Sequence, residues 1–371
     1  MDLDFTEEQQ MLRDTVRGVM ERYSPIEVVR AMEDDPVGYP EDLWKQLAEL
    51  GLLGITLPER YGGAGLTLLD AAILYEEFGR ALCPSPHFAS SVMSAGVLLA
   101  AGSQEQKDAW LPKIAAGEAI LVPAWLEPDG GFGPEGIGLR AERTGSEIVL
   151  NGVKRHVPFA SSADRMVVLA RSDGGIDLYL VDPKAPGLKL TQQFSLASDT
   201  QYKAEFEGVR VAEADRIGEP GQGWQVWHQT MLEGIVLLAA QAAGGAQRAL
   251  EITVEYAKER KQFDKPLGAF QAIAHYLADA STVVDGATTL VWEAAWAHST
   301  GRSIARLAPM AKLFACRVFR DVTAVCEQVH GGYGFTIDYD IQLYFRRAKQ
   351  LQMTWWDSRY LEELIAADVL D

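Results

Sequence analysis

The chain has 371 residues, 48% of them hydrophobic and 23% charged, so it is long enough for two or three packed domains. Its formal net charge of -18, with no basic cluster to offset it, argues against nucleic acid as a partner. Its three cysteines form no C-x-x-C pair, no apolar run approaches the roughly 20 residues of a membrane span, and the start MDLDFTEEQQ is not a signal peptide. We therefore expect a cytoplasmic protein with no membrane span and no metal site.

The first 118 residues have the pattern of helices. Apolar residues recur at helical spacing over residues 5–23, and Thr6 before two glutamates fits a capped start. Residues 55–65 contain one proline and three glycines, which predicts a loop. Further helices are predicted at 41–50, 66–82, 88–101 and 104–116.

The period changes near residue 119 from helical to alternating. The following runs are short, apolar and separated by glycine, proline, aspartate and serine. They predict a small antiparallel β domain over residues 119–222, folded as a barrel or a sandwich. The predicted strands are 119–125, 138–143, 147–150, 155–159, 166–170, 176–181, 188–190 and 202–211.

The helical period returns over residues 223–371. Residues 231–261 lack proline and carry small residues, among them Ala240, Ala243, Gly244 and Gly245, so another backbone could pack very close. Long helices are also predicted at 271–299 and 305–330, with one or two shorter ones over 342–367. Such helices joined by short loops form a four-helix bundle, so the fold class is α+β with domains at 1–118, 119–222 and 223–371.

A glycine-rich turn, QVHGGYGF at residues 328–335, separates two of these helices. Paired glycines let a backbone approach a flat or charged ligand. The alternative is an ordinary glycine cap at the end of a helix.

Four long segments resemble motifs of the acyl-CoA dehydrogenase family, in the family's order and over essentially the whole chain. They are LAELGLLGITLPERYGGAGLTLLDAAILYEEFGRA (47–81), QEQKDAWLPKIAAGEA (104–119), YAKERKQFDKPLGAFQAIAH (256–275) and EQVHGGYGFTIDYDIQLYFRRAK (327–349). The resemblance implies a tetrameric FAD enzyme that oxidises an acyl-CoA thioester to its 2,3-enoyl product. It also implies a carboxylate base, hydrogen bonds to the thioester oxygen, and reoxidation by an electron-transferring flavoprotein.

In this family each FAD lies between two subunits. One set of motifs grips the adenine and pyrophosphate end of a flavin whose ring sits in the neighbouring subunit, and here that set looks intact. An arginine suits pyrophosphate because its charge is permanent and its donors are forked. For Arg260 the alternative is a solvated helix charge, and for Phe263 a core side chain rather than a stacking one. The matching residues are Arg260, Gln262, Phe263, Gln271, Gln328, Gly331 and Gly332.

The second set faces the flavin in the subunit's own site, and it departs from the family. A TEPGAGSD-like loop is replaced by LEPDGGFG at residues 126–133. The usual Trp-Ile-Thr is replaced by His156, Val157 and Pro158, and proline offers neither a hydroxyl nor an N–H. His156 is either a lone catalytic group or, as we favour, a structural histidine.

The two sequence positions expected for the catalytic base also differ from the family. One family position for it aligns with Gly234 and Ile235, with Glu233 one residue early, and one helical step turns a side chain by about 100°. The other position, in a Tyr-Glu-Gly-Thr segment, aligns with Trp355 or Trp356, and Asp357 is the nearest carboxylate.

The motifs that would contact a neighbouring subunit's FAD match the family. The motifs that would contact the flavin in the chain's own site all depart from it. This pattern predicts a non-identical partner: a catalytic acyl-CoA dehydrogenase subunit to whose FAD site the chain contributes the nucleotide half. Heterotetrameric dehydrogenases of bacterial steroid side-chain breakdown are similar, which implies a bulky CoA thioester such as a steroid side-chain intermediate. The alternatives are a self-sufficient homotetramer using Asp357 or Glu233, and a non-enzymatic scaffold or CoA-ester-binding protein.

Overall fold

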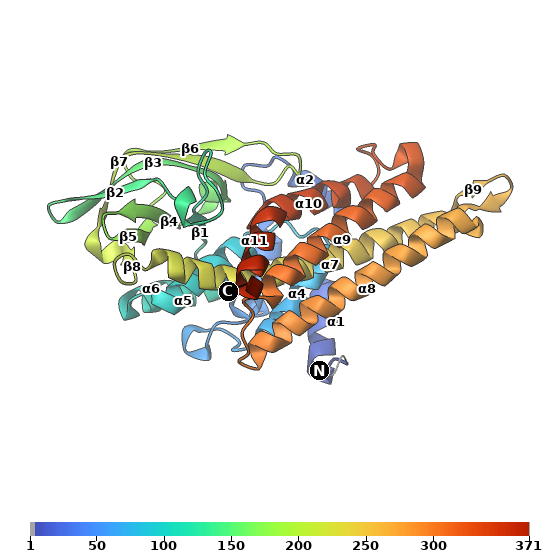
Figure 1. Ribbon diagram of the computed structural model, residues 1–371, viewed down its shortest axis with the longest axis horizontal. Coiled ribbons are helices and arrows are strands. Elements are labelled where there is room, and N and C mark those ends of the chain that lie inside the picture. The colour runs from blue at the N-terminus through green and yellow to red at the C-terminus, as the bar shows by residue number, and fades with distance from the viewer. Residues whose placement is uncertain (1–3, 371) are drawn as a thin grey trace. The chain divides into compact units, whose positions relative to one another are not determined.

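The computed structural model describes residues 4–370 and separates into two compact units (Figure 1). The helical unit contains the chain up to Val29, Thr67–Cys83 and everything described from Ile235 onward. The sheet unit contains Arg30–Leu66 and Pro84–Gly234. Among the described residues, no helix is both long and apolar enough to cross a membrane.

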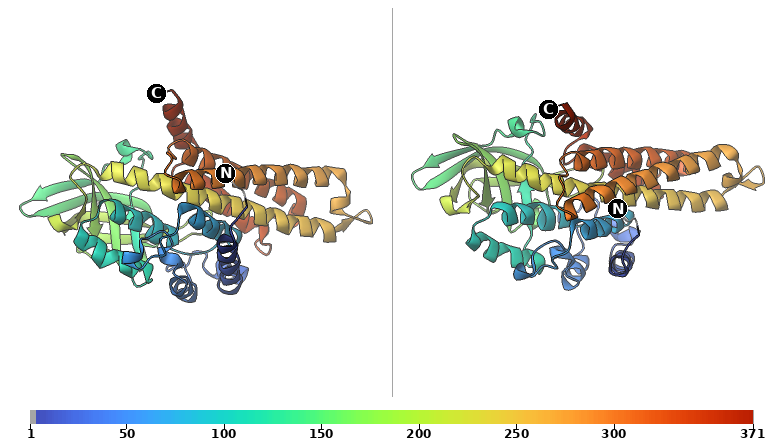
Figure 2. Two further views of the ribbon diagram at one scale, coloured as in Figure 1. Left: turned by 90° about the horizontal axis from the view of Figure 1, so that it is seen from below. Right: turned by 60° about the horizontal axis from the view of Figure 1, so that its bottom comes forward.

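Four long helices run side by side in the helical unit (Figures 1 and 2). They are α7 (Gly223–Glu259, of which the part from Ile235 lies in this unit), α8 (Gln271–Ser299), α9 (Leu307–His330) and α10 (Ile341–Met353). The predicted four-helix bundle is therefore confirmed. Also in this unit are α1 (Glu7–Tyr23), which packs on α4 (Leu68–Arg80), and α11 (Ser358–Leu370). A short helix that the sequence analysis missed, α2 (Ile26–Ala31), follows α1.

Helices α4 and α7 cross with their backbones in contact, as the small residues of α7 predicted. A Cβ added to Gly244 would lie 2.0 Å from the carbonyl oxygen of Glu76, and one added to Gly79 would lie 1.9 Å from that of Gln241. Only glycine at both positions lets the two helices approach this closely. The crossing fixes α4, and with it the buried acidic pair Glu76 and Glu77.

The sheet unit is built on one eight-stranded sheet in the order β6-β7-β3-β2-β4-β5-β8, with β1 paired to β4. Its helices are α3 (Glu41–Glu49), the π-helix η3 (Phe88–Ser94), α5 (Ala95–Ala101) and α6 (Gln104–Ala115). The strands are β1 (Leu121–Ala124), β2 (Arg140–Thr144), β3 (Glu147–Pro158), β4 (Arg165–Ser172), β5 (Gly175–Val181), β6 (Leu188–Gln193), β7 (Gln201–Ala212) and β8 (Arg216–Ile217).

The predicted class, helices around a middle β sheet, is confirmed, but three details differ. The sheet is mixed rather than antiparallel, because β1 runs parallel to β4. The two strands predicted at 147–150 and 155–159 are one strand, β3, interrupted by irregular register. Helix α7 ends at Glu259, and a small hairpin of β9 (Lys261–Gln262) and β10 (Lys265–Pro266) leads into α8.

Short 3₁₀ turns complete the secondary structure. They are η1 (Leu52–Gly54), η2 (Glu59–Tyr61), η4 (Pro134–Gly136), η5 (Ala160–Ser162), η6 (Glu213–Asp215), η7 (Leu267–Ala269) and η8 (Gly331–Tyr333).

Candidate functional site

Two of the motifs expected to bind the nucleotide meet at one end of the helical unit. The guanidinium carbon of Arg260, just after α7, lies 5.6 Å from the ring centre of Tyr333 in η8. Gly331 has φ 64° and ψ -140°, a conformation that favours glycine. A Cβ added to Gly331 or Gly332 would meet no atom within 4 Å, so the space beside this backbone is open. The structure thus brings together two motifs that lie far apart in the sequence.

An aromatic cluster holds the glycine turn against α7. The rings of Tyr256 and His330 stack with centres 4.2 Å apart, and Tyr339 packs edge-on to both. The backbone oxygen of Cys326 lies 2.8 Å from Nδ1 of His330, so Nδ1 carries the proton and donates it. Burial lowers the pKa of His330, which keeps the ring neutral. The turn is therefore positioned by uncharged contacts, and the charge at this end comes from Arg260 and its neighbours.

The remaining residues of this set point to solvent. Phe263 is 88% exposed at the tip of the β9–β10 hairpin, where it and Asp264 have φ angles of 51° and 62°. Two successive residues with positive φ are typical of a tight two-residue hairpin turn. Phe263 is thus no core side chain within this chain, although its ring centre lies 6.3 Å from that of Phe270. Exposed polar residues of the same set are Gln262, Gln271 and Gln328.

These features fit the nucleotide half of FAD. The pyrophosphate needs cations and backbone N–H groups. Arg260 beside the glycine turn is exposed, as are Lys261 and Lys265 of the β9–β10 hairpin, and the backbone at Gly331 and Gly332 is open. Adenine needs a flat apolar surface, which Phe263 and Tyr333 provide. Exposed aromatic rings beside exposed cations are therefore compatible with a bound nucleotide at this end.

The loop at residues 126–133 is tied into its own unit. Oε1 of Glu127 accepts hydrogen bonds from the backbone N–H groups of Gly138 (3.0 Å) and Leu139 (2.9 Å) and from Nζ of Lys154 (2.6 Å). Lys154 is fully buried, and burial lowers its pKa to about 8 despite the neighbouring carboxylate. Glu127 therefore holds the loop and neutralises Lys154. The hydroxyl and the Ser-Asp pair that the resemblance leads us to expect in this loop are absent from the sequence.

His156 is held as a structural residue. Its φ is 54°, at an irregularity in the pairing of β3 with β7. Its N–H donates to Oε1 of Gln193 (3.0 Å), and its Nδ1 lies 2.6 Å from Oε1 of Gln201. Two residues on, the Pro158 nitrogen has no hydrogen to donate. This segment does not fit the flavin contacts that the resemblance implies.

The first family position for the base is sterically closed. Gly234 is buried, and a Cβ there would lie 2.8 Å from Sδ of Met93 and 3.2 Å from Cζ of Phe88, both in η3. Ile235 is completely buried, and Glu233 is half-buried. A glutamate side chain could not occupy position 234 unless the side chains of Met93 and Phe88 moved. Of residues 233–235, Glu233 alone carries a carboxylate.

The second position for the base is occupied by tryptophan. Trp355 and Trp356 have φ angles of 53° and 71°, and Trp356 is completely buried. Asp357 accepts a hydrogen bond at Oδ1 from the N–H of Tyr360 (2.9 Å), which makes it a cap at the start of α11. This bond engages one of its two carboxylate oxygens. The geometry gives Asp357 a structural role and leaves its action as a base a proposal.

Lys312, which the sequence analysis missed, fixes this segment. Its fully buried Nζ donates to the carbonyl oxygens of Leu351 (3.0 Å), Thr354 (3.0 Å) and Trp356 (2.8 Å). Burial lowers its pKa, and the three carbonyls satisfy its three donors. The signal in the sequence was a lysine at a helical spacing shared with Ala308, Ala315 and Phe319, which form the buried face of α9.

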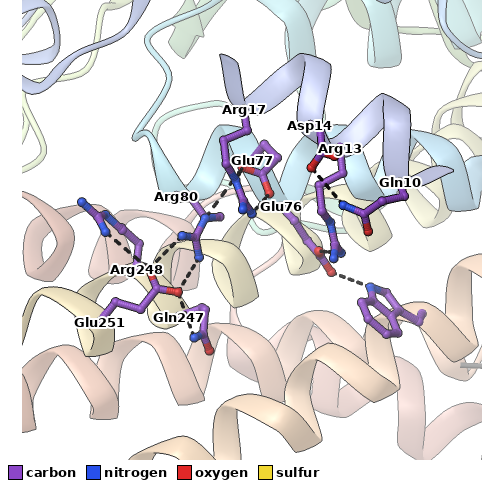
Figure 3. Close-up of polar contacts among 11 residues, drawn as sticks. Gln10, Arg13, Asp14, Arg17, Glu76, Glu77, Arg80, Gln247, Arg248 and Glu251 are labelled. Carbon is purple, nitrogen blue, oxygen red and sulfur yellow. Dashed lines mark hydrogen bonds and ion pairs between the residues drawn. The ribbon is translucent and has the colours of Figure 1, made fainter. Parts of the chain in front are cut away.

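A cavity of about 230 Å³ in the helical unit is lined in part by three arginines, Arg17, Arg80 and Arg248. Figure 3 shows these arginines beside the acids Glu77 and Glu251. Arg17 binds Glu77 (2.7 Å), while Arg80 (2.7 Å) and Arg248 (3.4 Å) bind Glu251. Burial opposes ionisation of Glu251, but hydrogen bonds from Arg80 and Gln247 bring its pKa down to about 2. Since each guanidinium already has a carboxylate partner, the cluster joins α1, α4 and α7 and is not an open anion site.

The chain matches sequence models of all three acyl-CoA dehydrogenase domains, in order. The N-terminal domain matches residues 6–118, the middle domain residues 124–209 and the C-terminal domain residues 221–369.

Individual proteins match over nearly their full length. The chain is 33% identical to a probable acyl-CoA dehydrogenase, YngJ, of Bacillus subtilis, over 100% of both chains. Among solved structures it is similar to the ChsE4-ChsE5 complex from Mycobacterium tuberculosis (TM-score 0.91, 28% identity, 100% and 99% of the two chains). It is also similar to a Tcur3481-Tcur3483 steroid ACAD variant (TM-score 0.87, 32% identity, 98% and 99%).

Proposed function

The chain belongs to the acyl-CoA dehydrogenase family, whose members bind FAD, and we propose that it acts as one subunit of a heteromeric enzyme of this type. In this proposal it supplies the nucleotide half of the FAD site of a second, catalytic dehydrogenase subunit. The complex would desaturate an acyl-CoA thioester between carbons 2 and 3.

One contrast carries the proposal. The nucleotide-binding end, with Arg260, Phe263 and Gly331, is assembled and open to solvent. The chain's own base positions are filled, by the side chains around Gly234 and by Trp355 and Trp356. An enzyme built from this chain alone would need a usable base position as well as a nucleotide-binding end.

The division of chemical labour follows from these residues. FAD, when bound, would supply the acceptor for the hydride that leaves the β-carbon of the thioester. Arg260 would neutralise pyrophosphate charge, and the backbone at Gly331 and Gly332 would donate N–H groups to it. The carboxylate that removes the α-proton would come from the partner, because the chain offers only Glu233 and the capping Asp357.

We extend the proposal to the substrate, to the protein that reoxidises the flavin and to the cellular location. Two structures similar to this chain are named as a complex and as a steroid ACAD, which supports a bulky substrate such as a steroid side-chain CoA ester. An electron-transferring flavoprotein would reoxidise the flavin. A cytoplasmic location accords with three cysteines that are all free.

Arg260→Ala tests the proposal in a complex co-expressed with an acyl-CoA dehydrogenase from a neighbouring reading frame. Losing a charge-assisted contact worth about 1.5–3 kcal/mol should weaken FAD retention by about 10- to 100-fold. Flavin absorbance per complex and acyl-CoA-dependent dye reduction measure the loss. The control is Arg359→Ala on α11, an exposed arginine that pairs with Glu363, and it should change neither the FAD content nor the activity.

The competing functions give different results in the same experiment. Unchanged FAD content and activity in Arg260→Ala would favour the non-enzymatic scaffold or CoA-ester-binding role. The chain purified alone should carry little FAD, and the co-expressed complex about half a flavin per subunit. One tightly bound FAD per chain, with acyl-CoA-dependent dye reduction by the chain alone, would instead establish the homotetramer that uses Asp357 or Glu233.

A further inference from the structure

The cavity of about 230 Å³ beside the arginine cluster of Figure 3 is built from several helices. Its walls come from α1, the turn after α1, and α2, α4, α7 and α10, all within the helical unit. The volume is below the roughly 300–1,000 Å³ of sites for drug-sized ligands, so the cavity suits a small molecule. The chemistry of its walls narrows the class of that molecule.

Ser24 brings an unused hydroxyl to this cavity. The residue is 4% exposed, and its Oγ is buried with no hydrogen-bond partner among the residues that the structure describes. Its backbone N–H donates to the carbonyl oxygen of Met20 at the end of α1, so that cap does not need the hydroxyl. A buried hydroxyl without a partner is unfavourable and uncommon in folded proteins. It points to a bound molecule that supplies the missing hydrogen bond.

Three guanidinium groups and two carboxylates form the basic side of the cavity. Arg17 donates to Glu77 through Nε (3.0 Å) and Nη2 (2.7 Å), and no bond to a described residue uses its Nη1. Arg80 uses Nη1 and Nη2 for Glu251. Arg248 reaches Glu251 only at 3.4 Å, and its side chain is 47% exposed. This side therefore has one positive charge in excess and N–H donors still to satisfy.

Glu21 forms the acidic side. It is exposed, lines the cavity and forms no ion pair with any residue in the described part of the chain. Arg17, one turn earlier on α1, binds Glu77 instead. Helix α1 ends here, at Tyr23, and the carbonyl groups at the end of a helix favour a cation. An anion alone would thus meet Glu21, and a cation alone would meet the arginines.

The rest of the wall is apolar. Met20 is 3% exposed, and Pro25, Ile26 and Ala81 also line the cavity. These side chains accept a short aliphatic group, which gains free energy in proportion to the apolar area removed from water. The molecule that fits has an anionic, a cationic and a small apolar part and carries no net charge.

We infer that the cavity binds an α-amino acid with a short aliphatic side chain, in its zwitterionic form. The ligand's carboxylate accepts hydrogen bonds from Arg17 and Arg248, and its ammonium donates to Glu21 and to Oγ of Ser24. Its side chain packs on Met20. The bound amino acid joins α1 to α7 and stabilises the helical unit according to its occupancy. The inference is independent of the flavin role, because the residues that line the cavity differ from those predicted for the nucleotide.

Isothermal titration calorimetry of the full chain with L-alanine, L-valine and L-leucine tests the inference. We expect at least one of them to bind with a Kd of about 1 mM or lower, a modest affinity for so small a ligand. Two analogues of that amino acid complete the test, the carboxylic acid without the amino group and the amino amide without the carboxylate. Each should bind at least about tenfold more weakly, since each leaves one charged side of the cavity without a partner.

Ser24→Ala separates a ligand-binding hydroxyl from a structural one. Because Oγ of Ser24 has no partner in the free chain, the variant should unfold at the wild-type temperature or slightly above it. It should nevertheless bind the amino acid about tenfold more weakly. Glu21→Gln should weaken binding by a similar factor, and Glu8→Gln, at an exposed position of the same helix, should not.

Failure of all three amino acids to bind at about 20 mM would overturn the inference. So would equal binding of either analogue, or wild-type affinity in Ser24→Ala, which would place the ligand elsewhere. A lower unfolding temperature of Ser24→Ala without ligand would give the hydroxyl a structural partner and would also count against it. None of these results depends on the FAD content of Arg260→Ala, so either proposal can fail alone.

Discussion

At the scale of single residues, helix α9 carries a buried acid, Glu327, directly before the glycine turn. Both carboxylate oxygens of Glu327 are buried and accept no hydrogen bond from any residue that the structure describes. A Cβ on Gly334 would lie 2.5 Å from Oε2, so the carboxylate fills the space over that glycine. Burial raises the pKa of Glu327, which means that the folded chain disfavours its ionised form.

Glu327→Val should therefore stabilise the chain. An unsatisfied buried polar group costs about 1–3 kcal/mol, and valine removes it without adding volume beneath Gly334. Because the pKa in the folded chain is raised, the penalty is absent at low pH and grows as the carboxyl ionises, so the gain should be larger at pH 8 than at pH 5. Urea unfolding at the two pH values measures it, with Glu255→Val, an exposed acid of α7, as the neutral control. A loss of stability at pH 8 would mean that the carboxylate has a partner.

The residues predicted for the nucleotide site, among them Arg260, Gly331 and Gly332, belong to contiguous motifs that can be recognised in the sequence. The structure brings two of these motifs to one end of the helical unit, and their role in binding stays a prediction. Lys312 and Glu327 were missed because their environments come from segments that fold against them, such as the carbonyls after α10. A charged residue at a buried helical position is the only sequence signal for such groups.

At the scale of elements, the crossing of α4 and α7 depends on two glycines. Gly244 contacts the backbone of Glu76, and Gly79 contacts that of Gln241. Any side chain at either point pushes two helix backbones apart. The displaced helix would be α4, which carries Glu77 and Arg80 of the charged cluster in Figure 3.

Gly244→Ala should destabilise the chain by about 2–3 kcal/mol or more, because the new methyl group would meet a main-chain oxygen that cannot move alone. The matched control is Gly18→Ala in α1, where an added Cβ meets nothing within 4 Å. That change should stabilise by about 0.5–1 kcal/mol through helix propensity. Thermal or urea unfolding of both variants gives the comparison, and equal effects of the two alanines would show that the helices do not touch at Gly244.

Helices and strands were largely predictable because periodicity reports burial directly. The alternating runs after residue 119 are strands in the structure. The glycine and alanine content of α7 predicted that another helix packs close to it, and this helix is α4. Periodicity says nothing about which strand pairs with which, so the parallel pairing of β1 with β4 was missed. Two-residue strands such as β9 and β10 have no period to detect, and only their turn geometry defines them.

At the scale of the whole molecule, stability should decline as pH rises. The formal net charge of -18 produces self-repulsion that grows with ionisation. Glu76 adds a local term: it is buried where α1, α4 and α8 meet, and it binds Arg13 (2.9 Å) and accepts a hydrogen bond from Nε1 of Trp292. Burial raises its pKa from about 4.5 to about 7 against the opposing effect of Arg13 and Trp292.

Salt separates these two contributions. A carboxyl whose pKa is raised in the folded chain favours folding fully below about pH 4.5, and that contribution is lost as pH rises through about 7. The loss from Glu76 is on the order of 3 kcal/mol between these limits. Salt at about 0.5 M screens the exposed charges but not Glu76 beneath α1, so at high salt the remaining pH dependence between 5 and 8 should come from Glu76 together with other buried groups such as Glu327 and His330. Glu76→Gln should reduce this slope in unfolding curves, while Glu105→Gln at an exposed position should not. An unchanged slope in Glu76→Gln at high salt would assign the pH dependence to the other groups.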